Sequence, residues 1–180
     1  MNIWRHLRAI LILPVMVTLV IPAGLIFLTG QFAVGWGLTF PLSLVPAIVG
    51  CALIGPGLAL LIKTASQFAA IGRGTLAPWD PTQALVVEGV YRHVRNPMIS
   101  GVLSVLLGEA VLLGSWPLLG WFLLFFLLNG LYIPLVEEPA LIDRFDGDYL
   151  VYKQNVPRWI PRLTSWTPTS TNQVCDRDKI

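Results

Sequence analysis

The chain gathers its polar chemistry in two short segments, and the first is the run GVYRHVRNPMISG, Gly89 to Gly101. Arg92, His93, Arg95 and Asn96 fall within five residues there, although only 12% of the chain is charged. Arginine at the start of a membrane helix commonly reaches toward lipid headgroups. Asn-Pro, in contrast, predicts a helix start with proline in the first turn. The free backbone N–H groups of such a start favour an anion such as a carboxylate.

The second segment is the pair Glu137-Glu138, at the point where a long apolar run meets polar sequence. Adjacent carboxylates at such a border are often a solvated helix end, and the residue types support a site and a surface equally. We expect Pro134 to kink the helix and Pro139 to end it. A carboxylate held at a kinked helix end beside cations suits an ammonium group. The two segments together therefore favour a zwitterionic ligand.

The remaining reactive side chains give weaker signals. Glu109 lies inside an apolar run, where a carboxylate is costly and first suggests a function. Its distance from the polar segments favours a structural hydrogen bond between helices instead. Cys51 and Cys175 show no metal-binding spacing and nothing pairs them, so we expect neither a metal site nor a disulfide framework. No basic run of the kind that binds nucleic acid is present, so none is expected as a partner.

The composition requires these residues to be positioned by membrane helices. The chain has 180 residues, of which 55% are hydrophobic and 12% charged, whereas a soluble domain carries about a quarter charged residues. We predict an all-α integral membrane protein with four spans, at about residues 9–28, 40–62, 98–113 and 118–136. Prolines and glycines in the second span predict a kinked helix. The Gly-Ser-Trp-Pro run at 114–117 predicts a tight turn, so the last two spans should form an antiparallel hairpin.

The distribution of charge predicts the orientation. Residues 29–39 and 114–117 contain no charged side chain, and the cations of the other loops and of both termini fall on the opposite side. By the positive-inside rule, the termini and the central loop should face the cytoplasm, with the bacterial inner membrane as the expected location. After the last span we expect an amphipathic cytoplasmic helix over Pro139–Asn155, which lies at least partly on the membrane surface, and an extended segment over 156–161. Residues 1–163 should form a single domain and 164–180 a disordered tail.

The motifs of both polar segments resemble those of a known family. LVVEGVYRHVRNPMISG followed by EEPALIDRFDGDYLVYKQNVPRWIP resembles the isoprenylcysteine carboxyl methyltransferase family and its bacterial relatives, which include phospholipid methyltransferases. The shared features are a Gly-x-Tyr, an Arg-His/Asn-Pro-x-Tyr, a helical hairpin, a Glu-Glu pair, a Phe-Gly-x-x-Tyr-x-x-Tyr and a Val-Pro-Arg, between about Leu85 and Pro161. The resemblance implies an integral membrane enzyme that binds S-adenosylmethionine between the hairpin and the tail.

The resemblance also implies which positions contact the cofactor. S-adenosylmethionine carries an amino group and a carboxylate, which makes it the kind of zwitterion that the two segments favour. By position, the contacts fall on Gln83, Ala84, Leu85, Val86, Tyr91, Asn96, Pro97, Met98, Ile99 and the pair Glu137 and Glu138.

Four positions depart from the family pattern. Asn96 stands in place of the histidine, so this position keeps its hydrogen bonds and loses a titrating group. Ile99 stands in place of the tyrosine. The Phe-Gly pair is broken by Asp146, with Gly147 one place late. Ile133 stands where the prenylcysteine enzymes carry an arginine for the substrate carboxylate, so a prenylcysteine has no obvious partner here.

We therefore expect methyl transfer to a lipophilic or amphiphilic acceptor that enters from the lipid. Such an in-line displacement needs mainly alignment, which can contribute about 7–11 kcal/mol. Arg95 would orient the cofactor or the acceptor as a fixed charge. His93 or Tyr91 would accept a proton if the acceptor is an amine or a thiol.

Two other functions remain open at this point. Membrane sterol and enone reductases share a similar C-terminal hairpin and use NADPH, but they need more cations for the 2′-phosphate and more spans. A non-enzymatic membrane scaffold that kept the fold is the second alternative, and Asn96, Ile99 and Ile133 are the features that favour it. The cofactor that the protein binds would distinguish the three.

Overall fold

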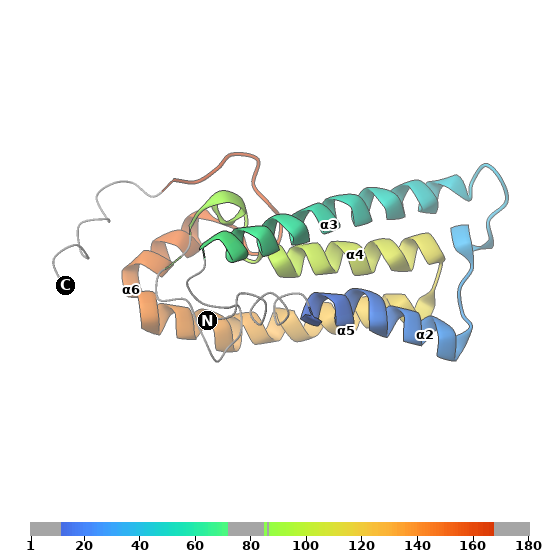
Figure 1. The fold of residues 1–180 in the computed structure, drawn as a ribbon, viewed down its shortest axis with the longest axis horizontal. Coiled ribbons are helices and arrows are strands. Elements are labelled where there is room, and N and C mark those ends of the chain that lie inside the picture. The colour runs from blue at the N-terminus through green and yellow to red at the C-terminus, as the bar shows by residue number, and fades with distance from the viewer. Residues whose placement is uncertain (1–11, 72–84, 86, 168–180) are drawn as a thin grey trace.

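Four helical segments run side by side along the longest axis of the molecule (Figure 1). The structure is a computed structural model that describes residues 12–71, 85 and 87–167. The helices are α2 (Ile21–Thr29), which continues the π-helical turn η1 (Met16–Val20), α3 (Leu44–Ile71), α4 (Pro97–Leu113) and α5 (Trp116–Tyr132). No strand is present in these residues. The all-α membrane fold expected from the composition is confirmed.

Three helices are long and apolar enough to cross a membrane, and a fourth is shorter. The long ones extend over Ile12–Gly37, Leu44–Gln67 and Trp116–Asn155, and the shorter one is α4, with 17 residues. The second span differs from its predicted bounds at both ends. Phe40 to Ser43 form a turn before α3, and the helix then continues to Ile71 with Pro56 inside it.

Close contact between α3 and α4 depends on glycines that face each other. A Cβ atom on Gly57 would lie 2.9 Å from the Gly101 carbonyl oxygen, and a Cβ atom on Gly101 would lie 2.9 Å from that of Gly57. The pair Gly50 and Gly108 repeats this arrangement two turns further along. Ser104 donates a hydrogen bond from Oγ to a carbonyl oxygen of α3 at 2.7 Å. Small residues of this kind allow membrane helices to approach closely, and this contact fixes where α4 begins.

The predicted hairpin between the last two spans is present. Gly114 ends α4 with a φ of 56°, a left-handed conformation that glycine adopts without strain. Ser115 is buried and donates from Oγ to the Gln31 carbonyl oxygen at 2.7 Å. Trp36, in the 3₁₀ turn η2 (Val34–Gly37), donates from Nε1 to the Val111 carbonyl oxygen at 2.9 Å. The loop after α2 therefore closes the charge-free end of the hairpin.

The helix that begins at Trp116 does not end at Pro139, as the sequence had suggested. It continues through the π-helical turn η4 (Ile133–Glu137) into α6 (Glu138–Asn155). Pro139 occupies the first turn of α6, where a missing N–H costs little. The π turn at Pro134 absorbs the local change in hydrogen bonding, as such bulges do. The backbone leaves helical geometry later, at Asp146.

The apolar face of α6 is covered by protein. Tyr149 and Tyr152 are buried, with Val156, against the partly buried Leu85 and Trp166. The chain after Asn155 contains no helix up to Thr167, and it bends at residues 156 and 158–160 instead of running fully extended. Trp166 packs on Tyr152 with the ring centroids 5.9 Å apart, so the part of the expected disordered tail that is described, 164–167, is attached to the fold. Residues 168–180 lie outside the described residues.

Candidate functional site

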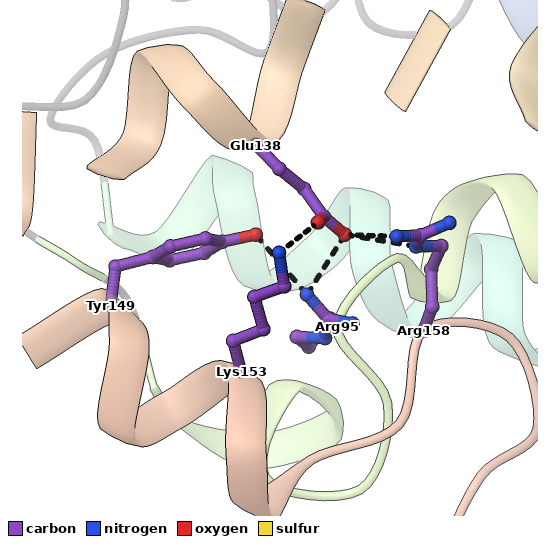
Figure 2. A network of polar contacts seen from close by, with 5 residues as sticks. All are labelled: Arg95, Glu138, Tyr149, Lys153 and Arg158. Carbon is purple, nitrogen blue, oxygen red and sulfur yellow. Dashed lines mark hydrogen bonds and ion pairs between the residues drawn. The ribbon is translucent and has the colours of Figure 1, made fainter. Parts of the chain in front are cut away.

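A single buried carboxylate joins three parts of the chain at the charged end of the molecule (Figure 2). Glu138 is 2% exposed, at the start of α6. Its Oε1 accepts from Arg95 Nη1 at 2.9 Å and pairs with Arg158 Nη2 at 2.7 Å. Its Oε2 pairs with Lys153 Nζ at 2.7 Å. A buried carboxylate is stable in its charged form only when paired in this way, so the three cations keep Glu138 ionised.

Arg95 is the most enclosed of the three cations. Its side chain is 9% exposed, and Nη1 also donates to the Tyr149 hydroxyl at 3.3 Å. Its Nε is buried and has no acceptor among the described residues. A buried donor without an acceptor is costly, so Arg95 has one hydrogen bond left to give to a group that the described residues do not supply.

The segment Val156–Thr167, which we call the strap, lies against residues 92–100. The N–H groups of Arg95 and Asn96 donate to the carbonyl oxygens of Pro157 and Arg158, at 2.9 and 3.3 Å. The N–H groups of Arg162 and Trp166 in the strap donate in return to the carbonyl oxygens of His93 and Arg92, both at 3.0 Å. Ser100 Oγ donates to the Trp159 carbonyl oxygen at 2.9 Å. The strap and the start of α4 therefore form one unit.

These bonds narrow the anion site that the sequence suggested at the start of α4. The N–H groups of Arg95 and Asn96 are occupied by the strap, and Pro97 has none. Asn96 makes no side-chain cap. The first four N–H groups of a helix have no intrahelical acceptor. The helical hydrogen bonds of α4 begin with the N–H of Ser100, which donates to the Asn96 carbonyl oxygen at 3.0 Å. The N–H groups of Met98 and Ile99 therefore have no acceptor among the residues that the structure describes and could bind a ligand.

Glu137 differs from its neighbour Glu138. It is partly buried and makes no ion pair with another residue that the structure describes. Tyr91, in the 3₁₀ turn η3 (Gly89–Arg92), lies within electrostatic range of it. Burial, together with the nearby Tyr152 and Glu137, raises the pKa of Tyr91 well above its usual range. The Tyr91 phenol therefore keeps its proton at neutral pH.

His93 is held by the strap. Its Nδ1 lies 2.8 Å from the Arg162 carbonyl oxygen. Because a carbonyl oxygen only accepts, this hydrogen bond requires the ring proton on Nδ1 and leaves Nε2 as the acceptor of a neutral imidazole. Of the two proton acceptors expected from the sequence, His93 has an available atom, whereas Tyr91 is a donor.

The structure brings some of the expected site residues together and separates others. Arg95, Glu137, Glu138 and Tyr91 meet at one place. Leu85 packs on the α6 tyrosines, and Ile99 packs on the core formed by α4 and α5. Pro97 is buried at the start of α4 and Met98 follows it. Gln83, Ala84 and Val86 lie outside the described residues.

Sequence reasoning missed two cations and one hydroxyl of this site. Lys153 was counted only among the cations of one side, and Tyr149 and Arg158 appeared as letters of the family motifs, without a role in the site. The Tyr-x-x-Tyr and Val-Pro-Arg motifs contained the signal for these residues. The family pattern joins both motifs to the Glu-Glu pair, which suggests that they serve the same site. Arg158 reaches Glu138 from the strap, Lys153 reaches it from the end of α6, and Tyr149 is joined to it through Arg95.

The family of the chain follows from comparison with known proteins. The family model for phospholipid methyltransferase matches residues 45–147, more than half of the chain. The chain belongs to the phospholipid methyltransferase family. The resemblance read from the short motifs is thereby confirmed, and the family supports a methyltransferase embedded in the membrane. No curated protein and no solved structure matches the chain.

The phospholipid methyltransferase match ends at residue 147, within α6, and so covers only part of the site. Residues 45–147 include α3, α4, α5 and the first half of α6, and with them Arg95 and both glutamates. Lys153, Arg158 and the whole strap follow after it. Family membership therefore supports the hairpin and the Glu-Glu pair, and the closure of the site by the strap is a finding of the structure.

Proposed function

We propose that this protein transfers a methyl group from S-adenosylmethionine to a lipophilic or amphiphilic acceptor, at the end of the molecule that bears Glu137. The observation that carries the proposal is the difference between two adjacent carboxylates. Glu138 is neutralised by three cations, whereas Glu137 is partly buried and forms no ion pair with a described residue, with Arg158 acting on it only from a distance. A partly buried carboxylate of this kind suits an ammonium group from outside the chain.

The groups left over at this site fit the cofactor. Glu137 would hold its amino group. The N–H groups of Met98 and Ile99, with the positive end of the α4 helix dipole, would hold its carboxylate. Arg95 Nε, which is buried without an acceptor, supplies a further donor for an anionic or carbonyl oxygen. The same set of groups would not satisfy a ligand of one sign only.

Bound S-adenosylmethionine would supply a methyl group on a positively charged sulfur. An oxygen, nitrogen or sulfur atom of the acceptor would bond to the methyl carbon and displace that sulfur from it. The residues of the chain would align the two partners and exclude water, since positioning is the main requirement of such a displacement. Tyr91 would donate a hydrogen bond. His93 Nε2 would accept the proton of an amine or thiol acceptor, with Nδ1 held by the strap.

The structure favours a lipophilic acceptor that needs no arginine of the protein to bind a carboxylate. Ile133, where the prenylcysteine enzymes carry an arginine, is 1% exposed in the turn η4. A buried isoleucine offers no partner for a substrate carboxylate. The neighbouring Leu135 and Val136 are exposed, as expected where a membrane-spanning helix faces lipid, so an acceptor can reach the site from the bilayer.

The proposal is tested by incubating membranes that contain the protein with S-adenosylmethionine labelled in its methyl group, and then separating lipid, protein and small-molecule fractions. We expect label in the lipid or small amphiphile fraction, in excess over membranes without the protein. A matched variant, Glu137→Gln, should reduce that label strongly. Binding of S-adenosylmethionine by the purified protein, measured in parallel, separates a missing acceptor from a missing activity. Absence of both binding and transfer would overturn the proposal in favour of a scaffold.

A further inference from the structure

The helix α4 is shorter than the membrane-spanning helix beside it. Its 17 residues rise about 25 Å at 1.5 Å per residue, whereas the hydrocarbon core is about 30 Å thick. Over the same direction, α5 and η4 run from Trp116 to Glu137, about 33 Å at the same rise. Both helices start from the tight turn at the charge-free end. At the charged end, α5 and η4 therefore extend a few ångströms beyond the first residue of α4. Another segment of the chain must lie beside them there.

The strap occupies that place. The Trp159 carbonyl oxygen accepts from Ser100 Oγ, in the first turn of α4. The Trp159 ring lies 6.2 Å from the Phe126 ring of α5, and it packs on the core of buried residues between the two helices. The strap thus runs alongside the ends of the membrane-spanning helices, at a level that α5 still occupies with apolar residues.

The backbone of the strap is partly bonded to protein, and the backbone groups of Ile160 and Leu163, which bond to no described residue, are left to headgroups or water at the border of the hydrocarbon. Irregular backbone is tolerated near the hydrocarbon only where its polar groups are bonded to protein. Four consecutive or nearly consecutive carbonyl oxygens of the strap accept hydrogen bonds, those of Pro157, Arg158, Trp159 and Arg162. The N–H groups of Arg162 and Trp166 donate to the loop before α4.

The outer side of the strap is apolar. Ile160 is 79% exposed and Leu163 is 99% exposed, the largest exposures of any bulky apolar side chain described after Glu137. The strap contains two arginines and no acidic residue. Arg158 is neutralised by Glu138, but Arg162 makes no ion pair among the described residues and bonds only to the Asn155 carbonyl oxygen and the Thr164 hydroxyl. An apolar edge beside an unneutralised cation matches the border between acyl chains and anionic headgroups.

We propose that the strap is a membrane-interface segment, which inserts Ile160 and Leu163 among the lipid acyl chains and presents Arg162 to anionic headgroups. It completes the short helix α4 at the charged end of the bundle. The sequence predicted only an extended segment over 156–161 and a disordered tail from 164, and the placement does not depend on methyl transfer or on the identity of the cofactor.

Spin labels in lipid nanodiscs test the placement directly. Ile160→Cys and Leu163→Cys would each be labelled in a background with Cys51→Ser and Cys175→Ser, and collision rates measured with oxygen and with a water-soluble nickel chelate. Leu128→Cys, exposed on α5, is the control for lipid. Asp148→Cys, exposed on α6, is the control for water. We expect both strap labels to favour oxygen, at a depth of about 5–10 Å below the headgroups.

Two results would overturn the proposal. If the strap labels react with the nickel chelate as strongly as the label at 148, the strap lies in water. If they are protected from both reagents, the apolar edge is covered by protein, from a second copy or another chain. Circular dichroism of each labelled variant establishes that it is folded, so that a water-exposed label cannot come from an unfolded chain. Neither result depends on whether the protein transfers methyl groups.

Discussion

The two adjacent glutamates show how one residue step changes a role. Glu138 points into the ion-pair cluster of Figure 2, where it pairs with three cations of the chain. Glu137 is rotated about 100° around the helix axis from it, and its carboxylate forms no ion pair with a described residue. A sequence motif of two glutamates therefore combines one structural anchor with one candidate ligand.

This difference predicts that Glu137→Gln weakens binding of S-adenosylmethionine by about 10- to 100-fold, because a hydrogen bond to a charged group contributes about 1.5–3 kcal/mol. Isothermal titration calorimetry in detergent would measure it. Glu109→Gln is the matched control, since Glu109 is an intramembrane carboxylate of α4 with a buried Oε2 that has no hydrogen-bond partner among the described residues. Equal affinities of the two variants would remove the ammonium site from Glu137.

A second residue-scale prediction concerns Asp146. Its φ of 40° and ψ of −122° lie in a region that glycine adopts freely and other residues pay about 1–3 kcal/mol to occupy. The family pattern has glycine at this position. We expect Asp146→Gly to raise the free energy of unfolding by about 1 kcal/mol, after the entropy cost of glycine is offset. The denaturation midpoint in mixed micelles would report it.

The control for that change lies two residues away. Asp148 is exposed and in regular helix, so Asp148→Gly makes the same chemical change where glycine has no conformational advantage. That variant should lose a few tenths of a kcal/mol. Stabilisation by both variants would point to the loss of negative charge rather than to the backbone.

At the scale of elements, Glu138 fastens the loop before α4, the end of α6 and the strap through Arg95, Lys153 and Arg158. Removing the charge leaves Arg95 buried without a counter-ion, which typically costs about 3–5 kcal/mol. Glu138→Gln should therefore destabilise the protein by that amount. Lys153→Met should cost less than about 1 kcal/mol, because partly exposed ion pairs contribute little and the Lys153 side chain is 38% exposed. If the two variants lost similar stability, the burial of Arg95 would not depend on the charge of Glu138.

The packing of α3 on α4 yields a second element-scale prediction. Gly57→Ala places a Cβ atom 2.9 Å from the Gly101 carbonyl oxygen, a backbone atom that can move only with its helix. The helices must separate, so we expect a lower melting temperature and weaker cofactor binding, since α4 carries Met98 and Ile99. Gly55→Ala, on the same helix with open space at its Cβ, should leave both unchanged or raise stability slightly. Differential scanning fluorimetry in detergent distinguishes the two.

The elements that sequence predicted well are those specified by local signals. The hairpin follows from a Gly-Ser-Trp-Pro turn between two apolar runs, and the start of α4 from Asn96-Pro97. The continuation of α5 into α6 was missed because the effect of Pro139 depends on the turn before it, where a π-helical geometry removes the conflict. The position of the strap was also out of reach, because its bonds join residues far apart in the chain, such as His93 and Arg162, which are 69 residues apart, and no local pattern specifies such contacts.

At the scale of the whole molecule, the two ends have opposite chemistry. In Figure 1 the loops after α2 and after α4 lie at one end, and α6 and the strap lie at the other. Trp36 and Trp116 pack edge to face at the first end, 5.0 Å between centroids, as tryptophan commonly does at a membrane border. The second end holds the ion-pair cluster. The composition and the length of the apolar runs predicted this division, since no charged residue falls in either outer loop.

This asymmetry predicts the orientation in the membrane. From the Lys/Arg bias we expect the end with α6 and the strap to face the cytoplasm, where the proposed methyl donor would be supplied. Single cysteines at Thr39, exposed in the loop before α3, and at Asp148, exposed on α6, would be tested with a membrane-impermeant maleimide on intact cells, in the Cys51→Ser and Cys175→Ser background. We expect labelling of Thr39→Cys only, and labelling of Asp148→Cys only after the cells are opened. The reverse pattern would place the site outside the cytoplasm, away from its cofactor, and would contradict both the orientation and the proposed methyl donor.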